Sequence, residues 1–233
     1  MSVLAFTDGK SIKTLTSAKD HKRVFDGDRG LNTGGMGVIA PNPAYTKEYE
    51  ERAMKEIFIP TVEAMKKEGR TFKGVLYFGL ILTQDGPKVI EYNCRFGDPE
   101  TQAVLPLLET DLLDIMEATA AGRLSEVNVK WSSDSSCCLI LASGGYPKAY
   151  KKGLPISGLD EKGQLPDGSA EVFHAGTKLE DGKYFTNGGR VLGVTATAPT
   201  LAEAVKRAYA AAENISFEGL HKRMDIGARA LKA

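Results

Sequence analysis

Residues 74–94 read GVLYFGLILTQDGPKVIEYNC, and this stretch decides the fold. Its first ten residues are almost continuously apolar, as expected for a strand that is covered on both faces. The QDGP segment at 84–87 is typical of a turn. Residues 88–94 are therefore predicted to return as the neighbouring antiparallel strand.

N-terminal to this hairpin, we expect a strand pair, a long loop and one helix. Asp8-Gly9 between two strand-like runs is a strong signal for a tight turn. Pro60 must kink or divide the helix, which Thr46 can cap and Gly69 can end. The expected elements are strands at 2–7 and 11–15, a loop at 20–37 and a helix at 46–69.

C-terminal to the hairpin, the polar stretch 125–136 marks a change in composition, and we place a domain boundary there. The predicted domains are 1–126 and 127–233. We expect an α/β (α+β) fold: an antiparallel sheet with helices, followed by a small mixed α/β domain. The remaining predicted elements are helices at 101–122 and 201–214 and strands at 136–142, 170–174 and 190–197.

The composition excludes several classes of partner. Lys+Arg and Asp+Glu number 30 each, so no basic excess favours nucleic acid or an anionic membrane surface. No apolar run reaches membrane-spanning length. The three cysteines lack CxxC spacing, which argues against a disulfide framework or zinc site and fits a cytoplasmic protein.

The end of the second strand carries the first candidate site. Side chains alternate between faces along a strand, so Val89, Glu91, Asn93 and Arg95 are predicted to share one face, while residues 90, 92, 94 and 96 form a buried face. Glu91 and Asn93 offer hard oxygen ligands that suit Mg²⁺, and the Arg95 guanidinium suits a phosphate or carboxylate. The alternative is a solvated sheet edge with a surface ion pair.

The turn at 97–100 carries two further acids. Asp98 and Glu100 could bind an amine or hydroxyl group of a substrate. The alternative is that they are the cap and the first-turn acid of the following helix, and from these residues alone this helix-end interpretation is favoured.

A third candidate is the glycine-rich loop 26–37, DGDRGLNTGGMG. Its glycines would let backbone N–H groups approach an anion, and Asp26 and Asp28 could hold hydroxyls or an ammonium group. It is neither a Walker A loop nor a Rossmann fingerprint, and a flexible surface loop is the alternative. Outside it, we interpret His174 as a structural histidine. Arg190, after a Gly-Gly turn, is either a surface arginine or one that reaches the cleft, and the surface position is favoured.

Taken together, the segments DHKRVFDGDRGLNTGGMG, GVLYFGL, KVIEYNCRFGDPETQ and ASGGYP resemble one family. That family is glycinamide ribonucleotide synthetase (phosphoribosylamine–glycine ligase), a group of ATP-grasp enzymes of purine biosynthesis. The resemblance extends over essentially the whole chain, and its second half resembles the family's small C-terminal domain.

The resemblance implies a reaction and a set of roles. ATP would phosphorylate glycine to glycyl phosphate, and 5-phosphoribosylamine would attack it to give glycinamide ribonucleotide, ADP and phosphate. Glu91 and Asn93 would hold Mg²⁺ (or Mn²⁺), while Arg95 and Asp98 would be catalytic. The implied substrate-binding residues are Asp26, Asp28, Asn32, Thr33, Gly34, Gly35 and Glu100.

Two departures limit this expectation. Residues 74–82 offer no acidic metal ligand on the preceding strand. The family's N-terminal domain, lid and adenine-holding strands would precede the segment where this chain begins, so we expect a fragment that lacks the N-terminal half of its enzyme and is inactive alone. The alternatives are a binding or assembly module and another ATP-grasp ligase, such as a purine-pathway carboxylase.

Overall fold

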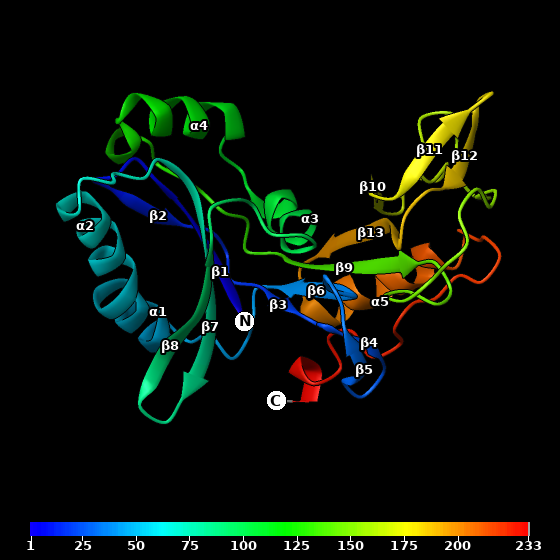
Figure 1. The fold of residues 1–233 in the computed structure, drawn as a ribbon, viewed down its shortest axis with the longest axis horizontal. Coiled ribbons are helices and arrows are strands. Elements are labelled where there is room, and N and C mark those ends of the chain that lie inside the picture. Colours follow the sequence, from blue (N-terminus) through cyan, green and yellow to red (C-terminus); the bar gives the residue numbers. More distant parts are fainter. Residues whose placement is uncertain (233) are drawn as a thin grey trace. The chain divides into compact units, whose positions relative to one another are not determined.

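The structure is a computed structural model and describes residues 1–232 (Figure 1). These residues form two compact units, each assembled from separate stretches of chain. Unit 1 comprises Met1–Lys19, Pro41–Gly97 and Leu107–Ser133, and unit 2 comprises Asp20–Ala40, Asp98–Pro106 and the residues from Asp134 onward. The units are therefore not the continuous segments 1–126 and 127–233. The chain does pass from unit 1 to unit 2 after Ser133, close to the predicted boundary.

Unit 1 is built on a four-stranded antiparallel sheet whose strand order is β2-β1-β7-β8. The predicted hairpins are confirmed, and Gly9 adopts the positive φ of 83° that the first turn needs. The strands are β1 (Ser2–Thr7), β2 (Ile12–Thr14), β7 (Gly74–Thr83) and β8 (Gly86–Asn93).

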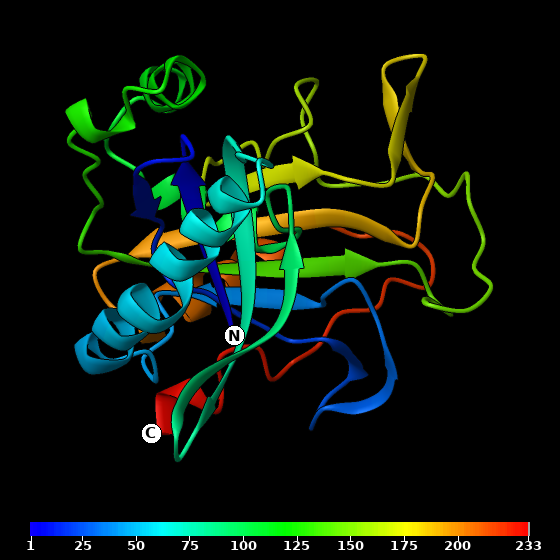
Figure 2. The ribbon, with the colours of Figure 1, turned by 60° about the vertical axis from the view of Figure 1, so that its left-hand side comes forward.

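One face of this sheet packs against a helical segment, which Figure 2 shows running across the strands. Thr46 caps α1 (Lys47–Ala53) by accepting a hydrogen bond from Tyr49 N, as predicted. A π-helical turn, η1 (Met54–Phe58), precedes α2 (Ile59–Lys67). The predicted irregularity at Pro60 is thus taken up by a widened turn, because proline has no N–H to donate to a regular helix.

The prediction of one helix over 101–122 is wrong. The structure has α3 (Glu100–Val104), a 3₁₀ turn at Leu105–Leu107 and α4 (Leu112–Ala121). Pro106 lies in the 3₁₀ turn, and the Asp111 side chain starts a new helix by accepting from Leu113 N at 2.7 Å. The break allows α3 to belong to unit 2 and α4 to unit 1.

Unit 2 is built on a five-stranded sheet whose order is β10-β13-β9-β6-β3. Helix α5 (Leu201–Ala212) packs on it through Ala204, Ala208, Ala211 and Ala212, whose small side chains allow close approach. The sheet strands are β3 (Lys19–Asp20), β6 (Gly37–Ala40), β9 (Ser135–Ala142), β10 (Glu171–His174) and β13 (Arg190–Ala198).

Two small hairpins accompany this sheet: β4 (Arg23–Phe25) with β5 (Arg29–Asn32), and β11 (Thr177–Glu180) with β12 (Lys183–Thr186). The prediction of an unstructured loop over 20–37 is therefore wrong, since β3, β4, β5 and the start of β6 lie in it. The pairing of β6 with β9 brings this early segment into unit 2. Within residues 1–232, no helix has the length and apolar character needed to cross a bilayer.

Candidate functional site

Strand β8 carries the predicted metal ligands near its end. Glu91 lies opposite Gly79 on β7, and Asn93 lies opposite Tyr77. A Cβ at position 79 would come within 2.8 Å of Glu91 Cγ, so glycine leaves room for the Glu91 side chain to lie across β7. Glu91 and Asn93, two residues apart, therefore present their oxygens on one face of the sheet.

The predicted alternation of side chains between the two faces of β8 fails at Ile90, directly before Glu91. The register shifts so that Leu80 pairs with Val89 while Gly79 pairs with Glu91, which leaves Ile90 as an extra residue. Val89 consequently joins Tyr92 and Cys94 and not Glu91, so the predicted face membership of Val89 is wrong. The buried face predicted from the same alternation is also wrong, because Ile90 is 66% exposed and Tyr92 is 48% exposed.

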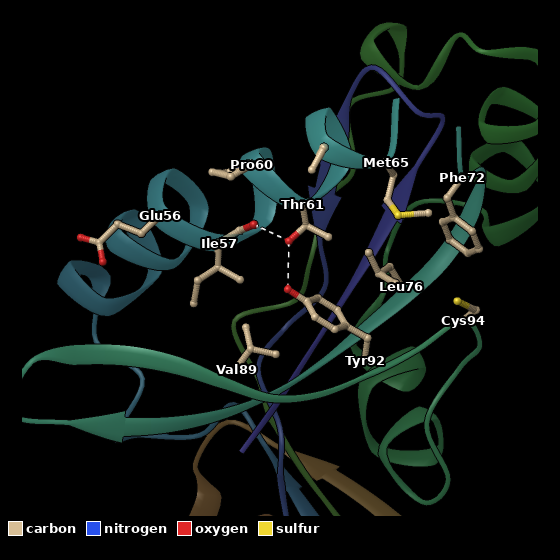
Figure 3. A pocket seen from close by; sticks show the side chains of 11 residues that line it. Glu56, Ile57, Pro60, Thr61, Met65, Phe72, Leu76, Val89, Tyr92 and Cys94 are labelled. Atoms are coloured by element: carbon tan, nitrogen blue, oxygen red, sulfur yellow. Dashed lines mark hydrogen bonds between the residues drawn. The ribbon is translucent and has the colours of Figure 1, made fainter. Parts of the chain in front are cut away.

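The face that carries Tyr92 borders an apolar pocket of about 560 Å³ between α2 and the β7–β8 hairpin (Figure 3). Thr61 Oγ1 donates to Ile57 O at 2.7 Å and lies 3.1 Å from Tyr92 Oη. The sulfur of Cys94 lies at the far end, near Phe72 and Leu76. This pocket is on the side of the sheet away from Glu91.

Arg95 follows β8 and lines a second pocket of unit 1, of about 600 Å³, together with Lys73, Phe6 and Met116. Its Nη1 donates to Phe96 O at 2.7 Å. Lys73 Nζ donates to Ala120 O at 3.0 Å, which ties it to the end of α4. Arg95 and Lys73 therefore bring two basic side chains to a recess that is otherwise lined mostly by apolar residues.

The donor set on β8 fits a hard divalent cation that takes ligands from elsewhere. Among residues 1–232, no three or more His, Cys, Asp or Glu side chains are grouped as a metal site. A carboxylate and an amide two residues apart supply only two oxygens. Mg²⁺ tolerates this, because it commonly keeps several waters and binds substrate phosphates.

In unit 2, each of the four backbone N–H groups from Thr33 to Met36 donates a hydrogen bond. Thr33 N donates to Lys22 O, Gly34 N to Tyr146 Oη, and Gly35 N to Thr33 Oγ1. Met36 N donates to His21 O at 2.9 Å. Since all four donors have partners, the glycines here serve close packing, and an anion bound by these N–H groups would have to displace one of these partners.

Arg190, at the start of β13, connects this loop to the turn before α3. Its Nη1 donates to Gly34 O at 3.1 Å and to Asp98 O at 3.0 Å, and its Nη2 lies 3.1 Å from Asp98 Oδ2. Arg190 does follow a Gly-Gly turn, but our interpretation of it as a surface arginine is wrong. Asp98 also accepts from Gln102 Nε2 at 3.1 Å.

The helix-end interpretation of Asp98 and Glu100 holds only in part. The N-cap residue of α3 is Pro99, so Asp98 is not the cap. Glu100 does occupy the first turn of α3, yet it is almost fully buried. Its Oε1 lies 4.0 Å from Lys22 Nζ, which also forms an ion pair with the buried Asp20.

Burial, and then the nearby charge of Glu100, raises the pKa of Asp20 from 3.8 to about 6. The Lys22 ammonium group opposes this shift but does not cancel it. Two buried carboxylates and one lysine therefore form a compact charged cluster directly beneath the glycine loop, since a Cβ on Gly35 would meet Asp20 Oδ1 at 2.6 Å.

Asp26 and Asp28 have partners in the C-terminal segment. Asp26 Oδ1 accepts from Met224 N at 2.8 Å. Asp28 forms ion pairs with Arg223 and Arg229, both at 2.9 Å. Arg223 is fully buried and also binds Asp225, so these contacts fix the shape of the loop.

Sequence reasoning missed Asp20 and Arg223 as organising residues, and it favoured a surface position for Arg190. The two glycines before Arg190 were the available signal, because small residues often mark a close backbone approach. Nothing in the sequence pattern singles out Arg223. His174 behaves as a structural histidine, since its Nδ1 lies 2.9 Å from Thr177 Oγ1 and its Nε2 lies 2.9 Å from the carbonyl oxygen of residue 163.

Comparison with known proteins gives two family matches along the chain. Residues 1–101 match the model described as phosphoribosylglycinamide synthetase, ATP-grasp (A) domain, and residues 136–229 match the C domain of the same synthetase. These two matches place the chain in the ATP-grasp class. More particularly, the chain belongs to the phosphoribosylglycinamide synthetase family.

Relatives and solved structures agree with this assignment. A phosphoribosylamine–glycine ligase of Caldanaerobacter subterraneus is 51% identical over 97% of this chain and 53% of its own length. The crystal structure of the Thermotoga maritima phosphoribosylamine–glycine ligase superposes with a TM-score of 0.84 at 36% identity, covering 97% of this chain and 55% of that one. The chain spans about half the length of the curated relatives it matches.

A more distant likeness concerns the fold alone. The biotin carboxylase domain of the Hydrogenobacter thermophilus 2-oxoglutarate carboxylase, solved with MgADP and bicarbonate, gives a TM-score of 0.65 at 17% identity. It covers 94% of this chain and 46% of that chain.

Proposed function

We propose that this chain supplies the carboxy-terminal part of an ATP-dependent carbon–nitrogen ligase that joins glycine to 5-phosphoribosylamine. The products would be glycinamide ribonucleotide, ADP and phosphate, as in de novo purine biosynthesis. The observation that carries the proposal is the pair of family matches, in order, over 1–101 and 136–229. The oxygen-bearing side chains of Glu91 and Asn93 on β8 and the hydrogen-bonded glycine loop support it.

The proposed reaction has two steps. A glycine carboxylate oxygen attacks the γ-phosphorus of ATP, the bond to ADP breaks, and glycyl phosphate forms. The amine nitrogen of phosphoribosylamine then attacks the carbonyl carbon, phosphate leaves, and the nitrogen loses a proton. Neither step needs a protein nucleophile, so the chain contributes positioning and charge stabilisation.

Within unit 1, we assign the phosphate end of the reaction to β8. Glu91 and Asn93 would hold a Mg²⁺ ion, for which Mn²⁺ is a candidate substitute. A divalent ion held there would supply positive charge to stabilise the negative charge that develops on the phosphates. Arg95 would offer its remaining guanidinium donors to the transferring phosphoryl group, since an arginine fork matches phosphate geometry.

Within unit 2, we assign binding of the amine-bearing substrates to the loop and to the turn before α3. Asn32, Thr33, Gly34 and Gly35 would contact substrate through side-chain and carbonyl groups. Asp98 and Glu100 would supply the negative charge that an ammonium group requires. Asp26 and Asp28, through their bonds to the C-terminal segment, would keep the loop in its shape.

Calorimetry with Mg²⁺ and ADP tests the metal assignment on the chain itself. Glu91→Gln should remove the metal-dependent part of the binding heat, because the amide is a weaker ligand than the carboxylate. Glu63→Gln, an exposed glutamate on α2, is the matched control and should bind as the parent chain does. Equal heats for all three proteins would refute the role of Glu91.

Turnover is tested by pairing the chain with the amino-terminal half of the Caldanaerobacter relative. Phosphate release that requires glycine, phosphoribosylamine and ATP together supports the ligase, and Glu91→Gln should lower its rate roughly 100-fold or more. Release without glycine, or with another carboxylate in its place, would point to a different ATP-grasp ligase. MgADP binding by the chain, with no turnover in the paired enzyme, would favour the binding or assembly module.

A further inference from the structure

Arg190 contacts both the glycine loop and the turn before α3. Its guanidinium bonds Gly34 O at 3.1 Å, Gly35 O at 3.5 Å and Asp98 O at 3.0 Å, and it pairs with the Asp98 carboxylate at 3.1 Å. The side chain is only 18% exposed. One residue of β13 thus connects two segments that are distant from it, and from each other, in sequence.

The glycines of the loop are fitted to this arginine. A Cβ on Gly34 would lie 2.9 Å from both Cζ and Nη2 of Arg190, closer than side-chain carbons approach in proteins. On its other side, a Cβ on Gly35 would meet Pro99 Cδ at 2.5 Å and Asp20 Oδ1 at 2.6 Å. The loop is therefore held between the Arg190 fork and the Asp20–Pro99 side, with no space for a larger residue.

The backbone also directs Arg190 toward the loop. The register of β13 against β9 shifts between Arg190 and Leu192, an irregularity that re-aims the side chain at the strand end. Arg190 O accepts from Gly176 N at 2.9 Å, which holds the strand start in place. Tyr146 completes the support by accepting from Gly34 N at 3.1 Å.

Both oxygens of the Asp98 carboxylate have intramolecular partners in this arrangement. Oδ1 accepts from Gln102 Nε2 and Oδ2 pairs with Arg190. The position of this carboxylate is thus set by Arg190 on one side and by α3 on the other. A substrate amine that contacts Asp98 would meet a carboxylate already fixed in direction, which lowers the entropic cost of binding.

We infer that Arg190 is a positioning residue that fixes the Gly34–Gly35 loop and Asp98 in one arrangement for binding the amine-bearing substrates. The inference rests on the proposed function for its substrates and on the hydrogen bonds for its geometry. A lysine cannot replace this arginine, because a single ammonium group lacks the planar fork that reaches three carbonyls and a carboxylate together.

Hydrogen exchange on the chain tests the geometry without requiring activity. In Arg190→Lys and Arg190→Met, the amides of Gly34, Gly35 and Met36 should exchange about 10-fold to 100-fold faster, as expected for loss of one or two charge-assisted bonds. Amides in the middle of β9 should be unchanged. Arg207→Lys, in which the parent residue makes one bond to Thr197 O, is the matched control. Unchanged loop exchange in both Arg190 variants would overturn the inference.

Steady-state kinetics of the chain paired with the amino-terminal half of a relative tests the functional consequence. Arg190→Lys should raise KM for glycine or phosphoribosylamine about 10-fold, while KM for ATP stays within about twofold. Equal increases for all three substrates, or none, would overturn the positioning role. If the paired parent enzyme shows no glycine-dependent turnover, the proposed function fails, whereas the exchange result still decides whether Arg190 fixes the loop.

Discussion

Gly35 offers the sharpest test of how unit 2 is packed, through the substitution Gly35→Ala. Its φ of +121° is a conformation that residues with a side chain rarely adopt, and the strain of holding one there is about 1–3 kcal/mol. An added methyl group would also lie 2.5 Å from Pro99 Cδ and 2.6 Å from Asp20 Oδ1. Relieving such overpacking costs about 1–3 kcal/mol more.

The matched control is Gly168→Ala in the same unit. Gly168 has a φ of +62°, and nothing lies within 4 Å of a Cβ built on it. At Gly168 the only cost of the substitution is backbone strain, roughly 1–2 kcal/mol for an alanine in the left-handed conformation. The free energy of unfolding should therefore fall by about 2–6 kcal/mol for Gly35→Ala and by about 1–2 kcal/mol for Gly168→Ala.

Urea unfolding followed by far-ultraviolet circular dichroism measures both free energies, and exchange of the β9 amides assigns the loss to unit 2. The m-values should match that of the parent chain, because the surface exposed on unfolding is the same. If Gly35→Ala were no more destabilising than Gly168→Ala, the close packing of Gly35 against Asp20 and Pro99 would be refuted.

Two further predictions concern buried charge. The raised pKa of Asp20 means that its contribution to the free energy of unfolding is complete below its ordinary value of 3.8 and is lost as the pH rises through about 6. Asp20→Asn should remove this loss of roughly 3 kcal/mol between pH 4 and pH 7.5 in urea titrations, and parallel pH profiles for the two proteins would contradict it. Arg223→Met should destabilise the chain by about 3–5 kcal/mol, because it removes the fully buried arginine that pairs with the carboxylates of Asp28 and Asp225. Arg229→Met, which breaks an exposed pair to the same Asp28, should cost at most about 1 kcal/mol, and equal thermal shifts for both variants would contradict the assignment.

Local sequence pattern was reliable where neighbouring residues decide the structure. Asp8-Gly9 predicted its hairpin, Thr46 its helix cap and Pro60 its irregular turn, because each acts on the backbone within a few residues. The same reasoning failed at Ile90, where an extra residue in β8 changes which side chains share a face with Glu91. A bulge depends on the partner strand, so alternation along one strand could not predict it.

For the site, the sequence by itself determined the residue types: Glu91 and Asn93, which we propose as oxygen ligands, the acids at 98 and 100, and the glycine loop. Only the tertiary structure decided what surrounds them. Arg190 and Arg223 reach the loop from segments more than 150 residues away, and Asp20 acquires its shifted pKa from burial beside Glu100. The physical reason is that hydrogen bonding and desolvation depend on distance in space. Residue spacing along the chain reports that distance only within a single strand, helix or turn.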